Sequence, residues 1–360
     1  MKTDGHRIAY FISSHGFGHA TRASAVMAAL REREPGLEFE IFTATPEWLF
    51  DASLASGFEL HSVVTDIGLA QAGPMRTDLP LTVKRLDAFL PFDPALVASL
   101  AAEVRQAGCR LVVCDIAPLG LAVARAAGLP SVLIENFTWD WMYAEYFEEA
   151  PRLKDHAEML HQAFVSADYH IQAEPAYPQP DANLTTRPMS RSPREAAGVT
   201  RDRLGIPREA QAVLVTMGGI PEDYGFLDQL AASSDFYFVV PGGSRHERRG
   251  RLTLLPHRSD YFHPDLVAAC DAVVGKAGYS TVAEAFWANR PLGYVLRARF
   301  PEAAVIAGFI RQHMAGQEIP ECEFETGAWL ADLPGLLRLP RRPPSGPNGA
   351  AQAADFIGRI

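Results

Sequence analysis

Two parts of the sequence repeat one local order, in which a short apolar run is followed by a glycine-containing turn and then by a helix-forming stretch. The first consists of the apolar run 7–13, a turn at 14–19 and the alanine-rich segment 20–33. The second runs from Asp271 through a turn at 275–278 into the stretch 279–285. This order opens a βαβ unit, because parallel strands need a crossover connection that is usually helical. The chain is therefore predicted to be an α/β protein built on parallel sheets.

Further apolar runs place the two turns in separate domains. Strands are predicted at 39–43, 59–64, 111–115, 131–135 and 169–172, and in a second series at 212–216, 236–240, 252–255, 272–274 and 292–296. A polar stretch at 174–203 separates the two series. A length of 360 residues also fits two domains. We expect Rossmann-like domains at 1–200 and 205–338, with a last helix at 350–360 that packs back on the first.

Charge and cysteine usage exclude several classes of protein. The net charge is −10, which disfavours a nucleic-acid partner, and the basic run 245–251 contains Glu247 and is interpreted as a solvated loop. The four cysteines show no spacing typical of a metal site. The sequence shows neither a signal peptide nor an apolar run long enough to span a membrane. A cytoplasmic protein with at most peripheral membrane contact is predicted.

The first turn carries two histidines between a strand and a helix. His15, Gly16, Gly18 and His19 follow the first strand, where ligands of open α/β sheets bind. A neutral imidazole can take a proton from a hydroxyl near neutral pH, so His19 is the predicted general base, with His15 as the second candidate. Either histidine could instead only stabilise the turn. The turn lacks the third glycine of a dinucleotide site, which disfavours NAD.

The second turn has the composition of a diphosphate site. Glycine at 278 permits close approach of a ligand, and Ser280 and Thr281 supply N–H groups and hydroxyls at a helix start, where the dipole favours an anion. Glu284 lies one turn further and is predicted to accept hydrogen bonds from a ribose diol. An ordinary N-cap with Glu284 as its dipole partner is the alternative. The donor-site prediction also includes three neighbours, namely Lys276, Gly278 and Tyr279.

Other segments at strand ends complete the predicted site. Asp115 could orient the base or bind the acceptor, and it could equally be an N-cap. An aromatic segment after the strand 131–135 could form an acceptor platform or belong to the core. Its predicted acceptor residues are Asn136, Trp139 and Tyr143. On the donor side the prediction adds a glycine turn and one base-pocket residue, namely Gly218, Gly219 and His257.

The segments HGFGHATR (15–22), ARAAGLPSVLIENFTWDWMY (124–143) and GKAGYSTVAEA (275–285) resemble the glycosyltransferase-like N-terminal region of plant arabinokinase-type proteins and its stand-alone bacterial relatives. More distantly, the chain is similar to the GT-B transferases that make peptidoglycan lipid intermediates and monogalactosyldiacylglycerol. The resemblance implies an inverting GT-B enzyme with two Rossmann-like domains facing a central cleft. It matches His19 to the proposed base and 278–284 to the diphosphate and ribose contacts. Relatives carry further acidic residues near the donor sugar, of which only Glu302 is found here. None of the 360 residues resembles the kinase half, so phosphorylation of arabinose is not expected.

The predicted function is transfer of a sugar from a nucleoside-diphosphate donor, with UDP favoured, to a hydroxyl of an unidentified saccharide, lipid or small molecule. No cofactor and no metal are expected, because no DxD-type pair occurs beside a donor loop and a helix dipole can supply the positive field. Two alternatives stay open. One is a nucleotide-sugar epimerase or hydrolase on the same fold, and the other is a non-catalytic nucleotide-sugar-binding protein.

Overall fold

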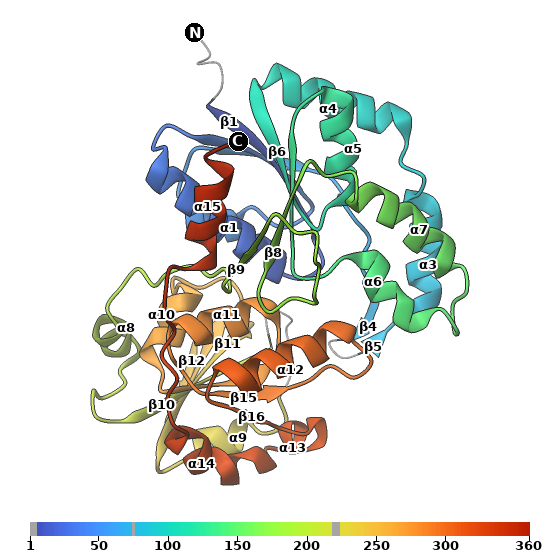
Figure 1. The fold of residues 1–360 in the computed structure, drawn as a ribbon. Helices are drawn as coiled ribbons and strands as arrows, with labels where there is room; N and C mark the ends of the chain where they lie inside the picture. Colours follow the sequence, from blue (N-terminus) through green and yellow to red (C-terminus); the bar gives the residue numbers. More distant parts are fainter. Residues whose placement is uncertain (1–5, 74–75, 218–223) are drawn as a thin grey trace. The chain divides into compact units, whose positions relative to one another are not determined.

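The computed structural model describes residues 6–73, 76–217 and 224–360. The chain divides into two compact units (Figure 1). Unit 1 comprises Met1–Met189, Arg299–Glu302 and Pro347–Ile360, and unit 2 comprises Ser190–Ala298 and Ala303–Gly346. Each unit contains one seven-stranded sheet.

The sheet of unit 1 is parallel throughout and has the strand order β3-β2-β1-β6-β7-β8-β9. The order reverses between β1 and β6, which makes the carboxyl ends of these two strands the topological switch point. The strands are β1 (Arg7–Ile12), β2 (Glu38–Thr43), β3 (Phe58–Ser62), β6 (Cys109–Asp115), β7 (Ser131–Glu135), β8 (Tyr169–Ala173) and β9 (Leu184–Thr186).

Helices join these parallel strands, and a small antiparallel pair lies outside the sheet. The helices are α1 (Gly18–Arg33), α2 (Trp48–Leu54), α3 (Leu79–Phe89), α4 (Pro94–Gln106), α5 (Pro118–Ala127), α6 (Trp139–Tyr143), the 3-10 turn η1 (Ala144–Tyr146), α7 (Leu153–Phe164) and α15 (Gly349–Ile357). The small pair is β4 (Gln71–Gly73) with β5 (Arg76–Thr77).

The helix α15 lies beside α1, at the other end of the sequence (Figure 1). The side chain of Asn348 caps α15 by accepting a hydrogen bond from the backbone N–H of Ala350 at 2.9 Å. An ion pair of 2.5 Å joins Arg33 at the end of α1 to Asp355 of α15. The inner face of α15, with Ala353 and Ile357, is buried, so this helix forms part of the core of unit 1.

The sheet of unit 2 has the order β12-β13-β11-β10-β14-β15-β16, with its switch point between β10 and β14. All pairs are parallel except β12 with β13. The strands are β10 (Gln211–Thr216), β11 (Phe236–Gly243), β12 (Glu247–Arg249), β13 (Leu252–Pro256), β14 (Ala272–Lys276), β15 (Leu292–Val295) and β16 (Gly316–Glu318).

The helices of unit 2 cover both faces of this sheet. They are α8 (Ala197–Leu204), α9 (Leu227–Ala231), α10 (His263–Ala269), α11 (Tyr279–Trp287), α12 (Pro301–His313, with its first two residues assigned to unit 1), α13 (Glu321–Thr326), the 3-10 turn η2 (Ala328–Asp332) and α14 (Leu333–Arg338). The core beneath α10, α11 and α12 contains side chains of Leu214, Val239, Leu255 and Val273. The helix α8 belongs to unit 2, although it precedes the expected start of the second domain at 205.

Each predicted strand is present to within three residues of its expected ends. The polar stretch 174–203 that separates the two series contains β9 and most of α8. The prediction of a loop at 245–251 is wrong, because this run contains the edge strand β12. The reason is pairing: Glu247–Arg249 aligns antiparallel with 252–254, and charged side chains are tolerated at an exposed sheet edge.

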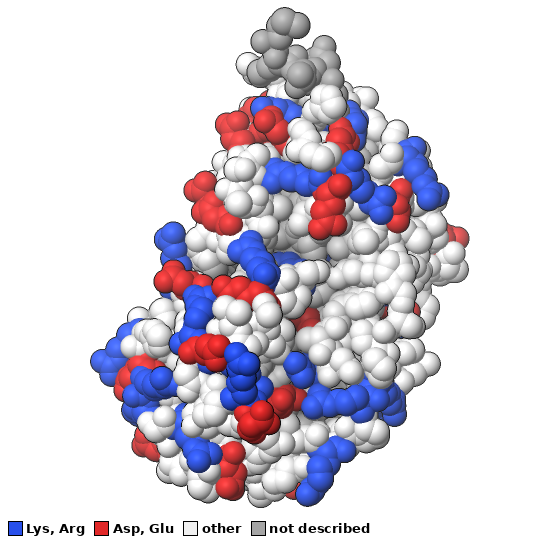
Figure 2. All heavy atoms as spheres, turned by 90° about the vertical axis from the view of Figure 1, so that its left-hand side faces the viewer, with Lys and Arg blue, Asp and Glu red and all other residues white. Residues whose placement is uncertain are grey.

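Basic and acidic side chains are mixed over the surface that Figure 2 displays. This distribution agrees with the negative net charge and gives no extended basic area on that face. Within the described ranges, no helix combines the length and the apolar character that crossing a bilayer demands.

Candidate active site

The first glycine turn connects β1 to α1 at the switch point of unit 1. After β1 the backbone N–H of Ser13 still bonds to the carbonyl of Asp115 at 3.1 Å, and Gly16 then adopts a φ of +75°, which favours glycine. The helix α1 begins at Gly18, because the N–H of Thr21 bonds to the carbonyl of Phe17 at 3.0 Å. His19 therefore lies in the first turn of α1. The sequence had predicted it on the loop before the helix.

The imidazole of His19 meets the end of β6. Its Nδ1 lies 3.0 Å from Oδ1 of Asp115, which is fully buried. Arg22, one helical turn after His19, donates two hydrogen bonds to the same carboxylate, from Nε to Oδ2 at 2.8 Å and from Nη2 to Oδ1 at 2.6 Å. Burial alone would raise the pKa of Asp115, but the Arg22 guanidinium and the hydrogen bonds from Arg22 and His19 hold it below its usual value. Asp115 is therefore an ionised acceptor.

This geometry selects one tautomer of His19. Nη2 of Arg22 also lies 3.3 Å from the His19 Nδ1, but a guanidinium only donates and an ionised carboxylate only accepts. The shorter contact to Asp115 is satisfied when Nδ1 carries the proton. Nε2 then holds the free lone pair and is the nitrogen that can accept a proton.

Asn136, which is buried, and Glu302, which is half-buried, continue this set of hydrogen bonds. Nη1 of Arg22 donates to Oδ1 of Asn136 at 2.6 Å, and Nδ2 of Asn136 donates to Oε1 of Glu302 at 2.6 Å. Asn136 follows β7 directly and is 2% exposed. The carboxylate of Glu302, predicted to contact the donor sugar, thus has a protein partner in this structure.

The aromatic residues predicted as an acceptor platform lie inside unit 1. Trp139 and Tyr143 are almost fully buried, and the Tyr143 hydroxyl donates to the carbonyl of Gly68 at 2.7 Å. The ring of His15 stands edge-on to Trp139, with centroids 5.0 Å apart. A Cβ at position 68 would lie 2.6 Å from Nδ1 of His15, so glycine is needed there. These aromatics support the turn that carries His15, and contact with an acceptor stays a prediction.

A second buried carboxylate, Asp66, lies behind the same turn. Its Oδ2 accepts hydrogen bonds from the Ser13 hydroxyl at 2.6 Å and from Nε1 of Trp139 at 2.7 Å. Within the part of the chain that the structure describes, no hydrogen bond reaches its buried Oδ1. Burial raises the pKa of Asp66 above its usual value, against the lowering effect of these donors and of His19.

The second glycine turn leaves β14 at the switch point of unit 2. Glycine is required at 275, because a Cβ there would lie 1.7 Å from the carbonyl oxygen of Thr216 on β10. Gly278 is the N-cap of α11, and Tyr279, Ser280 and Thr281 form its first turn. The N-cap is a glycine and so has no side chain to accept from the N–H groups of Ser280 and Thr281, which can bind an anion at this helix start.

Four further residues of the donor-site prediction lie at this turn, after another strand, or outside the described chain. Lys276 ends β14, and a Cβ at Gly278 would lie 3.8 Å from its Cε. His257 follows β13, and its backbone N–H bonds to the carbonyl of Gly243 at 2.9 Å. The predicted turn residues Gly218 and Gly219 lie outside the described residues.

Glu284 lies in the second turn of α11 and is 4% exposed. Its Oε1 accepts hydrogen bonds from Arg191, from Nη2 at 2.8 Å and from Nε at 3.2 Å. Its Oε2 accepts from Nδ1 of His263, the first residue of α10, at 2.5 Å. Burial would raise the pKa of Glu284, but Arg191 and His263 lower it to about 2.

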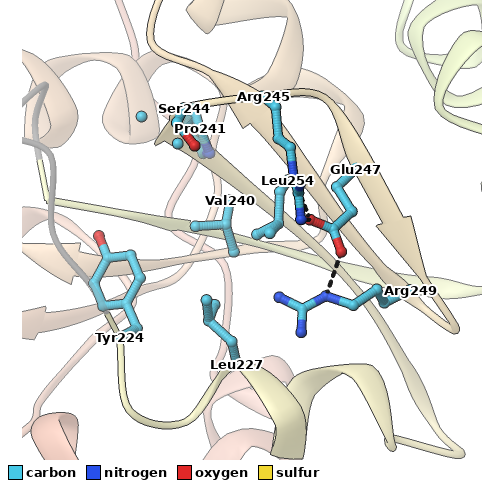
Figure 3. Close-up of a pocket in the computed structure, with 11 residues that line it drawn as sticks. Tyr224, Leu227, Val240, Pro241, Ser244, Arg245, Glu247, Arg249 and Leu254 are labelled. Atoms are coloured by element: carbon cyan, nitrogen blue, oxygen red, sulfur yellow. Dashed lines mark hydrogen bonds and ion pairs between the residues drawn. The ribbon is translucent and has the colours of Figure 1, made fainter.

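A cavity of about 550 Å³ opens elsewhere in unit 2 (Figure 3). Its floor includes Val240 of β11 and Leu254 of β13, which pair side by side in the sheet. Their chain neighbours Val239 and Leu255 point to the opposite face, into the core that α11 also contacts. The cavity therefore lies on the other face of the sheet from α11.

Ion pairs close one wall of this cavity. Figure 3 shows Glu247 between two arginines, with Oε2 bound to Arg245 at 2.8 Å and Oε1 to Arg249 at 3.0 Å. Among the described residues, its lining includes none of the predicted donor-site side chains.

The family model described as "Glycosyl transferase family 1" matches residues 6–334. The chain belongs to this glycosyltransferase family. It is 28% identical over 366 residues to L-arabinokinase of Arabidopsis thaliana, covering 97% of this chain and 34% of the plant enzyme. It is 26% identical over 235 residues to an uncharacterized glycosyltransferase of Methanopyrus kandleri, covering 60% of this chain and 65% of that protein. This chain thus spans about a third of the plant enzyme and less than two thirds of the archaeal one.

Solved structures support the same assignment at the level of the fold. The glycosyltransferase superimposes on MurG of Acinetobacter baumannii with a TM-score of 0.56 over 98% of this chain and 99% of MurG, at 15% identity. The architecture is GT-B, with two parallel-sheet α/β domains, as the sequence predicted.

The glycosyltransferase also contains polar residues near these turns that sequence reasoning missed. Arg22 had a detectable signal, because it follows His19 by one helical turn and so shares its face. Asp66, Arg191 and His263 had none, because each is brought to its partner by the tertiary fold alone.

Proposed function

We propose that this glycosyltransferase is an inverting enzyme that moves a sugar from a nucleoside-diphosphate donor to a hydroxyl acceptor without a metal. The observation that carries the proposal is the buried contact between Nδ1 of His19 and Oδ1 of Asp115, which leaves Nε2 of His19 as a proton acceptor. Its position at a switch point is where ligands of open α/β sheets bind.

The proposed step is a single displacement. His19 takes the proton of the acceptor hydroxyl, the oxygen attacks the anomeric carbon, and the bond to the diphosphate breaks on the opposite side. The proton ends on Nε2 of His19, and the ionised Asp115 stabilises the imidazolium through Nδ1. Arg22 fixes the Asp115 carboxylate for this task.

The departing diphosphate is proposed to bind at the start of α11. The N–H groups of Ser280 and Thr281 in the first turn and the helix dipole favour an anion there. These groups supply the positive field that a metal gives in other enzymes, which supports metal independence. Glu284, one turn later and held ionised, is proposed to accept a hydrogen bond from the ribose.

The first test is a thermal-shift screen of the purified protein against UDP, GDP, dTDP, ADP and NAD. A ligand that binds only the native state raises the melting temperature by mass action. We expect one nucleoside diphosphate, with UDP as the first candidate, to stabilise the wild type and the His19→Ala variant. The Glu284→Gln variant, which keeps the side-chain size, should respond much less.

Two outcomes distinguish this proposal from its alternatives. Stabilisation by NAD alone, or by none of these nucleotides, contradicts the donor site. Turnover of a bound donor without any acceptor, at the same rate in wild type and His19→Ala, favours a hydrolase or epimerase. In an active pair, NMR of the first-formed product must show the anomer opposite to that of the donor, since single displacement inverts the centre.

A further inference from the structure

The carboxylate of Glu284 is held by two residues from other segments of unit 2. Arg191 comes from the chain before α8 and binds Oε1 with two nitrogens, at 2.8 and 3.2 Å. His263 opens α10 and donates its Nδ1–H to Oε2 at 2.5 Å. An ionised carboxylate cannot donate, so the histidine must be the donor in this contact.

Arg191 is itself fixed by an aromatic ring. Its guanidinium carbon lies 4.8 Å from the ring centroid of Phe262, and the guanidinium carbon of Arg194 lies 4.1 Å from the same centroid. Arg194 makes none of the hydrogen bonds to Glu284. Arg191 is therefore held from two sides, by a charge and by a ring, and is poorly placed to swing away from Glu284.

This arrangement limits what Glu284 can still bind. A carboxylate offers about four lone-pair positions on its two oxygens. Arg191 takes the two positions of Oε1 and His263 takes one of Oε2, which leaves a single position on Oε2. A ribose diol offers two hydroxyls, and a carboxylate with one free position can accept from only one of them.

We infer that Arg191 and His263 are positioning residues, and that because of them Glu284 accepts a hydrogen bond from one ribose hydroxyl and none from the other. The inference rests on the proposed function, in which Glu284 binds the ribose of the donor. Arg191 sets the orientation of the carboxylate and His263 blocks its second position, so the selectivity belongs to the three residues together.

The test compares dissociation constants, measured by calorimetry at pH 7.5, of UDP, GDP and ADP with their 2′-deoxy and 3′-deoxy forms. For the nucleotide that binds, removal of one hydroxyl should weaken binding roughly tenfold, the effect of losing a hydrogen bond to a charged group. Removal of the other should change binding less than about threefold, an effect too small for such a bond. Equal losses for both hydroxyls overturn the inference and leave the donor site intact. No binding by any of the nine nucleotides overturns the donor site as well.

Variants assign the selectivity to its residues. In His263→Ala the second position of Oε2 becomes free, so Glu284 can also accept from the other hydroxyl. Removal of that hydroxyl should then weaken binding to the variant, although it has little effect on binding to the wild type. In Arg191→Met the carboxylate loses its orientation, and the ratio of the dissociation constants of the deoxy form and the parent nucleotide should fall toward one. The matched control is Arg194→Met, which removes the other cation from Phe262 and should keep the wild-type ratio. If Arg194→Met changes the ratio as much as Arg191→Met, the effect comes from Phe262 and the inference is wrong. If Arg191→Met does not fold, the comparison of the two deoxy forms in the wild type decides alone.

Discussion

Replacement of Arg22 by Met tests the electrostatic argument at His19. Arg22 supplies two of the three hydrogen bonds that Asp115 receives from His19 and Arg22, and both side chains are almost completely buried. Met fills a similar volume without a charge. Removal of one partner of a buried ion pair costs about 3–5 kcal/mol, because the remaining charge stays in a medium that solvates it poorly. We expect a loss of this size in the free energy of unfolding at pH 8.

The loss should depend on pH in a defined direction. In the wild type the pKa of Asp115 is lowered, so its ionisation stabilises the native state above about pH 4, and this contribution disappears as the pH falls through the lowered pKa. Without the guanidinium, burial raises the pKa and the ionised form destabilises the native state at neutral pH. The difference in the free energy of unfolding between variant and wild type should therefore be largest near pH 8 and shrink as the pH falls toward 4, where Asp115 is largely neutral in the folded variant.

The assay is urea unfolding at pH 8 and pH 4, followed by tryptophan fluorescence and by circular dichroism to check that the transitions coincide. Arg110→Met is the matched control, since Arg110 forms an exposed pair of 2.7 Å with Glu34 and its loss should cost less than about 1 kcal/mol. A cost for Arg22→Met no larger than that of the control, or one of equal size at both pH values, refutes the reasoning.

Three smaller predictions follow from single contacts. Gly275→Ala should abolish soluble folding, because the added Cβ would collide with the carbonyl oxygen of Thr216. Gly308→Ala in α12 is its control, because the space around the added Cβ is open there, and this variant should raise the free energy of unfolding by about 0.5–1 kcal/mol in the same urea assay. Asp66→Asn should be more stable than wild type by an amount that grows as pH rises from 4 to 8 in urea titrations, because the raised pKa of Asp66 means that its ionisation destabilises the native state. Cys322, the exposed cysteine among four free thiols, should react with a maleimide in the native protein while the three buried ones react only after unfolding, as mass spectrometry of the labelled peptides would show.

The sequence was sufficient for the strands and helices that carry a strong apolar pattern. The runs at β1, β6 and β14 are buried on both faces, so each reads as a continuous apolar segment with a turn signal after it. The strands β9, β12 and β16 have three residues each, which is too short for any periodic pattern. They exist because a neighbouring strand offers unpaired backbone groups, and that is a property of the assembled sheet.

The candidate site was predictable to the same extent. His19 and Glu284 stand next to glycine turns, so local sequence marks them. The role of Arg191 cannot be deduced in this way, because its partner Glu284 lies 93 positions away in the sequence. Burial of Trp139 and Tyr143 was also invisible, since an aromatic cluster has the same composition in a core and on a binding surface.

The path of the chain through the two units has a consequence for synthesis on the ribosome. Unit 1 includes Pro347–Ile360, and the residues of α15 emerge only after all of unit 2 has been translated. Until then the surface of α1 that α15 covers is exposed, while unit 2 already has its complete set of residues. Unit 2 can thus finish folding first, although most of unit 1 is made before it. A nascent chain stalled at residue 346 should present an uncovered apolar surface on α1, which is what chaperones bind.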